Sequence, residues 1–223
     1  MKDIVFDFGG VLVDWNPRYL YRKIFATSEE MEWFLAQVCT GEWNARQDAG
    51  RPFAQAVAEL QEKYPKYATQ IADYYARWDE MLGGEIKGTH AIVDELKARG
   101  YKLYGLTNWS AESFPLAQQR YPVLQQMDGI VVSGQEKLIK PDPEIYKRLL
   151  ERFALRAENC IFTDDNVTNC AAARTLGFDA IAFENAEQLR AQLQQRGVQS
   201  VRDVYLLMCS DAGQIYFAAK EPI

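Results

Sequence analysis

The residues of this sequence that are best suited to chemistry follow the ends of short apolar runs. Asp7 follows Ile4-Val5-Phe6, and Gly9 and Gly10 then allow the backbone to turn sharply. Polar groups also follow two later runs, and a lysine lies in a loop between them: Thr107 and Asn108, Lys140, and Asp164 with Asp165. If the runs are parallel strands, these groups meet at one carboxyl-end edge, where open α/β sheets bind their ligands. Taken alone, the Asp7 stretch is equally consistent with an aspartate that caps a turn.

The combination of carboxylates with a lysine indicates which ligands this edge would bind. Two or three carboxylates without histidine or thiol are hard oxygen ligands, which suit Mg²⁺. The natural partner of Lys140 beside them is a phosphate, whose developing charge a lysine and a metal ion can share. The alternative is a buried ion pair of Lys140 with Asp7 or Asp165, which would cost desolvation for little net stability.

The composition and net charge of the chain limit the kinds of molecule that it could bind and the mechanisms that it could use. The chain has 223 residues, 48% of them hydrophobic, and a net charge of -6, which argues against nucleic acid or an anionic membrane surface as the main partner. Apolar runs stay short of membrane-spanning length and the first residues lack a signal-peptide pattern, so we expect a cytoplasmic protein. The single histidine, His90, and four scattered cysteines argue against a zinc site and against Ser-His or Cys-His mechanisms.

The region after Asp14 is predicted to contain only helices. Start signals and one-sided apolar spacing indicate helices over about 17–25, 28–38, 51–64 and 68–82. Its many aromatic residues are expected in a core between these helices: Trp33, Phe34, Trp43, Tyr74, Tyr75 and Trp78. Residues 16–84 therefore form a predicted helical domain inserted into another domain.

Strands and helices alternate in the remainder of the chain. Short apolar strands are predicted at about 101–106, 129–132, 159–163 and 179–183, with helices between them. This order predicts an α/β fold with a doubly wound parallel sheet, formed by residues 1–15 and 85–200. Residues 201–223 are predicted to add a β-hairpin that turns at Asp211-Ala212-Gly213.

Four motifs in this order resemble a known family. They are DFGGVLVD, LTN, the lysine of GQEKLIKPDPEIY, and FTDDN. The chain resembles the haloacid dehalogenase-like (HAD) hydrolase superfamily, whose Rossmann-like core carries a helical cap inserted after the first motif. Within it, the sequence is most similar to bacterial phosphatases of the glucose-1-phosphate type, whose first motif also has Gly where most relatives have Asp. The cap stretch GEWNARQDAGRPFAQAVAEL is similar to the second and third cap helices of that group. The resemblance covers about residues 1–196.

The resemblance implies a role for each site residue. Asp7 would attack phosphorus and form an aspartyl-phosphate, and Lys140 would orient it and neutralise charge. Thr107 and the amide of Asn108 would hold the phosphate oxygens. The implied ligands of Mg²⁺ are Asp7, the carbonyl of Gly9, Asp165 and, directly or through water, Asp164. Asn169 would support them from the following helical turn.

Gly9 departs from the family pattern. Most phosphatases of the superfamily carry a second aspartate there, which protonates the leaving group and then activates water. General acid-base help of this kind contributes roughly a hundredfold to ten-thousandfold in rate. We expect slow hydrolysis assisted by water or a cap residue, combined with a substrate whose leaving group needs less help. The third interpretation of Gly9 is that the protein does not hydrolyse its ligand. The candidate cap groups are Glu42, Arg46 and Asp48, in a stretch predicted as loop. For each of them the alternative is a solvated charge on that loop.

The expected function is Mg²⁺-dependent hydrolysis of a small phosphorylated metabolite, with a sugar phosphate favoured, by a monomer or homodimer. A binding or regulatory domain that retains Mg²⁺ and phosphate affinity is the main alternative, and Gly9 favours it, whereas the retained nucleophile does not. The sequence is less consistent with a 2-haloacid dehalogenase, because the metal-free mechanism of those enzymes does not require the Asp164-Asp165 pair.

Overall fold

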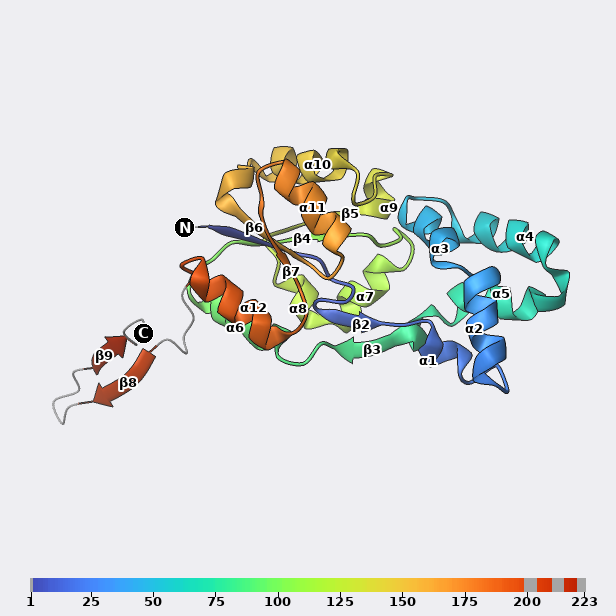
Figure 1. Ribbon diagram of the computed structural model, residues 1–223, viewed down its shortest axis with the longest axis horizontal. Coiled ribbons are helices and arrows are strands. Elements are labelled where there is room, and N and C mark those ends of the chain that lie inside the picture. The colour runs from blue at the N-terminus through green and yellow to red at the C-terminus, as the bar shows by residue number, and fades with distance from the viewer. Residues whose placement is uncertain (1, 199–203, 210–214, 220–223) are drawn as a thin grey trace.

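A five-stranded parallel sheet forms the centre of the protein (Figure 1). The computed structural model describes residues 2–198, 204–209 and 215–219. Neighbouring strands of the sheet follow the order β5-β4-β1-β6-β7. Their bounds are β1 (Asp3–Phe6), β4 (Leu103–Thr107), β5 (Gly129–Val132), β6 (Cys160–Asp164) and β7 (Asp179–Ala182). The predicted α/β fold with a doubly wound parallel sheet is confirmed.

Helices cover both faces of this sheet, and the alternation of side chains along β1 explains why. Ile4 and Phe6 belong to one buried cluster and Val5 to another, so the strand is apolar on both faces. In Figure 1, α10 and α11 lie over one face, and α6 and α12 over the other. The helices of this part are α6 (Thr89–Ala98), α7 (Phe114–Arg120), α8 (Pro122–Gln125), α9 (Ser133–Glu136), α10 (Pro143–Phe153), η3 (Ala157–Asn159), α11 (Val167–Thr175) and α12 (Ala186–Gln195).

A second group of helices lies between β1 and α6 in the sequence. It comprises α1 (Arg18–Tyr21), α2 (Ser28–Gln37), α3 (Gly41–Asp48), α4 (Phe53–Lys63), η1 (Pro65–Tyr67), α5 (Ala68–Ala76) and η2 (Trp78–Met81). Aromatic rings pack between these helices, as in the contacts of Tyr21 with Phe34 and of Trp43 with Tyr74. Trp33 is an exception to the predicted core, because it is 48% exposed. We call residues 16–84 the cap segment and propose that it is a separate domain.

The structure corrects two predictions for the cap segment. The predicted helix over 68–82 ends at Ala76, and the chain continues through η2 into strand β3 (Leu82–Glu85). β3 pairs antiparallel with β2 (Val13–Trp15), so a two-stranded ribbon leads into and out of the helices. The stretch predicted as loop around Asp48 is helix α3, whose first turn is capped by Thr40, since its side chain accepts a hydrogen bond from the Trp43 amide.

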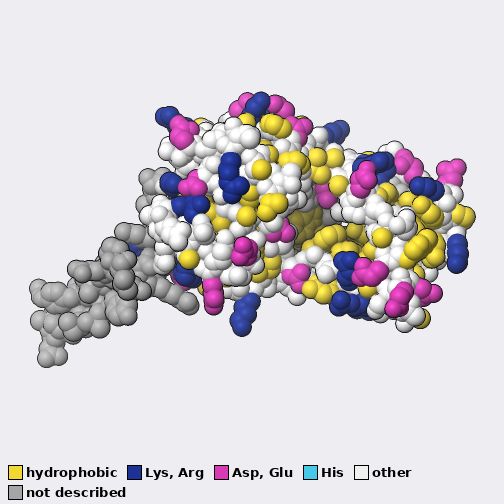
Figure 2. All heavy atoms as spheres, in the orientation of Figure 1, with side chains coloured by type: hydrophobic (Ala, Val, Ile, Leu, Met, Phe, Trp, Pro, Cys, Tyr) yellow, Lys and Arg dark blue, Asp and Glu magenta, His cyan; other side chains and the backbone are white. Residues whose placement is uncertain are grey.

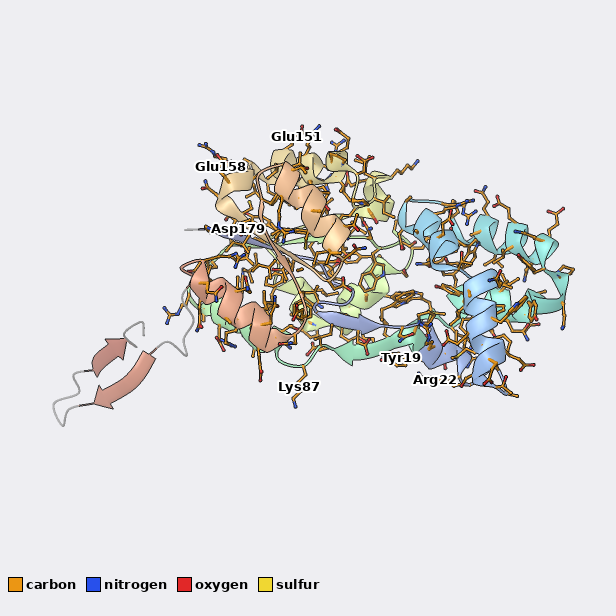
Figure 3. The ribbon with its side chains drawn as sticks, in the orientation of Figure 1. Tyr19, Arg22, Lys87, Glu151, Glu158 and Asp179 are labelled. Carbon is orange, nitrogen blue, oxygen red and sulfur yellow. The ribbon has the colours of Figure 1, made fainter. Side chains whose placement is uncertain are left out.

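The ribbon depends on a glycine. Tyr19, labelled in Figure 3, donates a hydrogen bond to Asp14 at 2.5 Å. A Cβ atom on Gly83 of β3 would lie 2.2 Å from Asp14 Oδ2 and 2.7 Å from the Tyr19 ring. The side chain of any other residue at position 83 would therefore displace this pair.

The surface and the chain end add two observations. On the face shown in Figure 2, acidic and basic side chains are interspersed. The surface is hollowed between the cap segment and the part of the protein that contains the parallel sheet, which we call the sheet domain. Within the described ranges, no helix is long and apolar enough to cross a membrane. Near the chain end, β8 (Val204–Cys209) and β9 (Ile215–Ala219) pair antiparallel. The predicted turn at 211–213 lies outside the described residues.

We predict that Gly105→Ala destabilises the sheet next to the site. A Cβ atom at this β4 position would lie 2.2 Å from the ring of Phe8, the residue after Asp7. Because overpacking a filled core costs about 1 to 3 kcal/mol, the urea unfolding midpoint should fall accordingly. Gly41→Ala is the control, since nothing lies within 4 Å of a Cβ there. Equal midpoints for the two variants would contradict this account of the packing.

Candidate active site

Asp7 follows the last residue of the central strand, at the carboxyl-end edge of the sheet. Its backbone N–H donates to the Thr163 carbonyl at 2.8 Å, which continues the pairing of β1 with β6. The residue is only 7% exposed, and its Oδ1 accepts a hydrogen bond from the Phe8 amide at 2.7 Å. The strand thus delivers a nearly buried carboxylate to the place where ligands of parallel sheets collect.

Lys140 joins the ends of two strands at this edge. Its ammonium group lies 3.0 Å from Asp7 Oδ2 and 2.7 Å from Asp164 Oδ2. It also donates to the Leu106 carbonyl at 2.9 Å. The side chains of Lys140 and Asp164 are completely buried. The ion pair of Lys140 with Asp7 that the sequence offered as an alternative to a phosphate site is therefore present as part of the same cluster.

Asp164 is surrounded by donors. Besides Lys140, its carboxylate accepts hydrogen bonds from Asn169 Nδ2, at 3.1 Å to each oxygen, and from the Asn166 amide at 2.8 Å. Asn169 on α11 therefore supports Asp164. Because both oxygens of Asp164 already have protein donors, its best defined task is to hold Lys140.

Asp165 faces the turn after Asp7. Gly10 has a positive φ of 76°, and a Cβ there would lie 2.3 Å from Asp165 Oδ2. Ligand atoms of Asp7, Asp164 and Asp165 all lie within 4.8 Å of one another. This set of hard carboxylate oxygens fits Mg²⁺. Gly10 thus has two reasons to be glycine, because its φ is left-handed and because it leaves room for this carboxylate.

Thr107 and Asn108 end β4 beside these groups. Thr107 is fully buried, and its Oγ1 has no hydrogen-bond partner among the described residues. An unpaired buried hydroxyl is costly, so a bound oxyanion would supply the partner that it lacks. The Asn108 side chain has another task, because it donates to the Lys140 carbonyl at 3.0 Å and accepts from the Lys140 amide at 2.8 Å.

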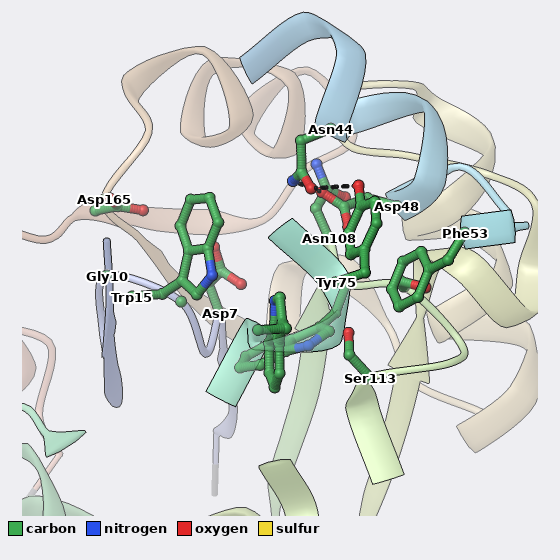
Figure 4. Close-up of a pocket in the computed structure, with 14 residues that line it drawn as sticks. Asp7, Gly10, Trp15, Asn44, Asp48, Phe53, Tyr75, Asn108, Ser113 and Asp165 are labelled. Atoms are coloured by element: carbon green, nitrogen blue, oxygen red, sulfur yellow. Dashed lines mark hydrogen bonds between the residues drawn. The ribbon is translucent and has the colours of Figure 1, made fainter. Parts of the chain in front are cut away.

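Asp7 and Asp165 line a pocket of about 250 Å³ (Figure 4). Core and cap segment both line it, with Asp7, Gly9, Gly10, Asn108, Trp109, Ser110, Ser113 and Asp165 from the sheet domain. Trp15 comes from the connecting ribbon, and Asn44, Asp48, Phe53, Tyr75 and Trp78 come from the cap segment. Lys140, Thr107 and Asp164 are not among the residues that line the pocket, and they are fully or almost fully buried.

The three candidate residues of the cap segment line two different cavities in the structure. Asp48 lines the pocket together with Asp7. Glu42 and Arg46 line a different cavity between α3 and α4, so the structure does not bring them to the site. The aromatic lining of the pocket was not predicted from the sequence. Tyr75 and Trp78 had been expected only in the helical core, whereas Trp15 and Phe53 had no distinguishing signal.

Burial raises the pKa of Asp7 to about 8, with Asp164 and Asp165 acting in the same direction and Lys140 in the opposite one. Burial also raises the pKa of Asp165. For Lys140, burial favours the neutral form, but Asp7 and Asp164 outweigh it and raise the pKa. One cation thus faces three carboxylates, and a second cation would stabilise their ionised forms.

Comparison with known proteins agrees with this geometry. Residues 1–177 match the family of haloacid dehalogenase-like hydrolases. The chain belongs to this family. The resemblance inferred from the four motifs is thereby confirmed at the level of the superfamily, and so is the prediction that this chain is a hydrolase.

The chain is also similar to two named phosphatases and to a solved HAD family enzyme. A sesquiterpene phosphatase of Aspergillus oryzae is 25% identical over 87% of this chain and 95% of its own length. A phosphorylated carbohydrates phosphatase of Thermotoga maritima is 24% identical over 81% of this chain and 84% of its own. A HAD family enzyme of Bacteroides thetaiotaomicron, solved in complex with magnesium and inorganic phosphate, is 21% identical and aligns with a TM-score of 0.63 over 83% and 95% of the two chains.

We predict that Lys140→Met destabilises this HAD-like hydrolase more at pH 8.5 than at pH 5.5. Without the ammonium group, two buried carboxylates lose their cation, and breaking such a pair costs about 3 to 5 kcal/mol. Asp7 already has a raised pKa in the folded protein. A carboxyl group of raised pKa binds protons more tightly when folded, so stability is lost as the pH rises toward that pKa.

Urea unfolding at both pH values in EDTA measures this effect. Lys147→Met is the matched control, because its ion pair with Glu144 on α10 lies at the surface. The control should unfold like wild type at both pH values. If Lys140→Met lost the same stability at both pH values, the buried ion cluster would not be the cause of that loss.

Proposed function

We propose that this chain is a Mg²⁺-dependent phosphatase that hydrolyses a small phosphorylated metabolite through an aspartyl-phosphate on Asp7. The observation that carries the proposal is the position of Asp7, which is bound to Lys140 and adjoins both the acidic cluster and the pocket. A nucleophile, a cation and hard metal ligands at one pocket are the requirements of phosphoryl transfer.

Each group of the site has a task in this proposal. Asp7 and Asp165, with the carbonyl of Gly9, would hold Mg²⁺, while Asp164 positions Lys140 and supports the metal directly or through water. The metal ion, when bound, supplies positive charge to the phosphoryl oxygens. Lys140 keeps Asp7 oriented for attack on phosphorus.

The phosphate is expected to bind at the end of β4. The Thr107 hydroxyl and the Asn108 amide would donate to its oxygens, which agrees with the missing partner of Thr107 Oγ1. The rest of the substrate would then extend toward the cap segment, because the pocket walls lie in that direction.

Two substrate classes fit the walls. A sugar phosphate is the first candidate, since the sequence is similar to phosphatases of that kind and the Thermotoga maritima relative bears such a name. The aromatic residues of the pocket favour a second candidate, the phosphate of a hydrocarbon alcohol. They are Trp15, Phe53, Tyr75, Trp78 and Trp109. The name of the Aspergillus oryzae relative points the same way.

Phosphate release from a substrate panel tests this function. The panel contains hexose phosphates, isoprenyl monophosphates, nucleotides and p-nitrophenyl phosphate, each with Mg²⁺ and with EDTA. We expect metal-dependent release that falls to background for Asp7→Asn, because the amide cannot accept the phosphoryl group. Preference for the sugar or the isoprenyl compounds decides between the two substrate classes.

The same panel tests the alternative of a silent binding domain. Wild-type protein that binds Mg²⁺ and inorganic phosphate in calorimetry, yet releases no phosphate from any compound, would overturn the proposed activity. Glu42→Gln is the control for Asp7→Asn, since Glu42 is exposed and lies outside the pocket.

A further inference from the structure

Position 9, two residues after Asp7, carries no acid, and the structure shows that steric exclusion is not the reason. A Cβ atom built on Gly9 meets nothing within 4 Å. At Gly10, by contrast, it would collide with Asp165. Position 9 therefore has room for a side chain that the sequence does not provide, and the leaving group must find its proton elsewhere.

The cap segment provides a carboxylate on the opposite wall. Among the described residues that line the pocket, the carboxylates are Asp7, Asp165 and Asp48. The first two belong to the acidic cluster. Asp48, the last residue of α3, reaches the pocket from the cap side, next to Asn44 and Tyr75 (Figure 4).

Hydrogen bonds to the sheet domain fix the position of Asp48. Its carbonyl accepts from Ser133 Oγ at 2.5 Å, and Ser133 Oγ in turn accepts from the Trp109 amide at 2.8 Å. Its carboxylate accepts from Asn44 Nδ2 at 3.1 Å, while Asn44 Oδ1 accepts from Tyr75 at 3.0 Å. The carboxyl group is thus held in the pocket from both sides of the cap–core boundary.

The surroundings of Asp48 suit proton transfer. Within the described part of the chain, no lysine or arginine forms an ion pair with it. Burial raises the pKa of Asp48 to about 7, against the opposing effect of the Ser110 amide. The titratable groups that face it are Tyr74 and Tyr75 of α5, and burial raises the pKa of both phenols, so they remain neutral. A carboxyl group that exchanges its proton near neutral pH is an effective general acid and base.

We propose that Asp48 replaces the carboxylate missing at position 9 and is the general acid and base of this hydrolase, an inference that rests on the proposed function. In the first step, Asp7 forms a bond to phosphorus as the bond to the leaving oxygen breaks. Protonated Asp48 gives its proton to that oxygen, so the product alcohol leaves and Asp48 becomes a carboxylate.

The second step restores both groups. Asp48 takes a proton from a water molecule, whose oxygen bonds to phosphorus while the bond to Asp7 breaks. Inorganic phosphate leaves, Asp7 is again a carboxylate and Asp48 is again protonated. Water is the only co-reactant.

Asp48→Asn tests the proposal with two substrates of nearly equal shape, phenyl phosphate and p-nitrophenyl phosphate. Phenolate needs a proton to leave, whereas p-nitrophenolate leaves readily without one. We expect the variant to lose about a hundredfold to ten-thousandfold in turnover of phenyl phosphate. With p-nitrophenyl phosphate it should release a burst of p-nitrophenol stoichiometric with enzyme and then slow down, because water is no longer activated.

The control is Glu42→Gln, a neutralised acid on the same helix but outside the pocket, which should behave like wild type with both substrates. Unchanged turnover by Asp48→Asn, or equal losses with both substrates and no burst, would overturn the role of Asp48 and leave the phosphatase intact. Wild-type protein inactive on both compounds and on the panel above would overturn the proposed function and, with it, this inference.

Restoring a carboxylate at the open position provides a second readout. Gly9→Asp introduced into Asp48→Asn should recover part of the lost turnover of phenyl phosphate, since position 9 has room for the side chain. A structural defect in the cap segment would not respond to a new acid on the core side. If the double variant does not turn over phenyl phosphate faster than Asp48→Asn, the result would contradict the proposal that Asp48 replaces a carboxylate at position 9.

Discussion

The buried ammonium group of Lys140 is the interaction on which the carboxyl-end edge depends. It holds together two strand ends that would otherwise bury the carboxylates of Asp7 and Asp164 without a paired side-chain cation. Charges buried in this way are retained only when geometry and further hydrogen bonds are good, and Asn169 and the Leu106 carbonyl complete the arrangement. Even so, negative charge remains in excess around Asp7. A further cation would therefore stabilise the ionised forms of all three carboxylates, those of Asp7, Asp164 and Asp165.

The sequence predicted this edge well because it follows from local pattern and topology. Strand-length apolar runs separated by helices determine a parallel sheet, and a parallel sheet brings the residues after its strands to one side. Asp7, Thr107 and Asp165 were found in this way. Lys140 comes from a loop, and the polar motif around it, together with the family resemblance, identified it.

The cap wall of the pocket was harder to predict, because it depends on how the helices sit on the sheet. Glu42 and Asp48 were equal candidates while their stretch was thought to be a loop. On helix α3 they are six residues apart, and at about 100° per residue they point to different sides. The pairing of β2 with β3 was also invisible, since it joins short segments on either side of the whole cap segment.

The hydrogen bond between Ser133 Oγ and the Asp48 carbonyl also affects when in the reaction cycle catalysis can occur. The cap segment is connected to the sheet domain through the β2–β3 ribbon, and contacts such as that of the Phe53 amide with Glu112 hold it closed. If substrate enters past these contacts, their separation would carry Asp48 away with the cap segment. An open molecule would then hold a nucleophile without its proton donor. The protein would thus be able to catalyse hydrolysis only while the cap segment encloses the substrate. The rate at which the cap segment opens would then set an upper limit on turnover.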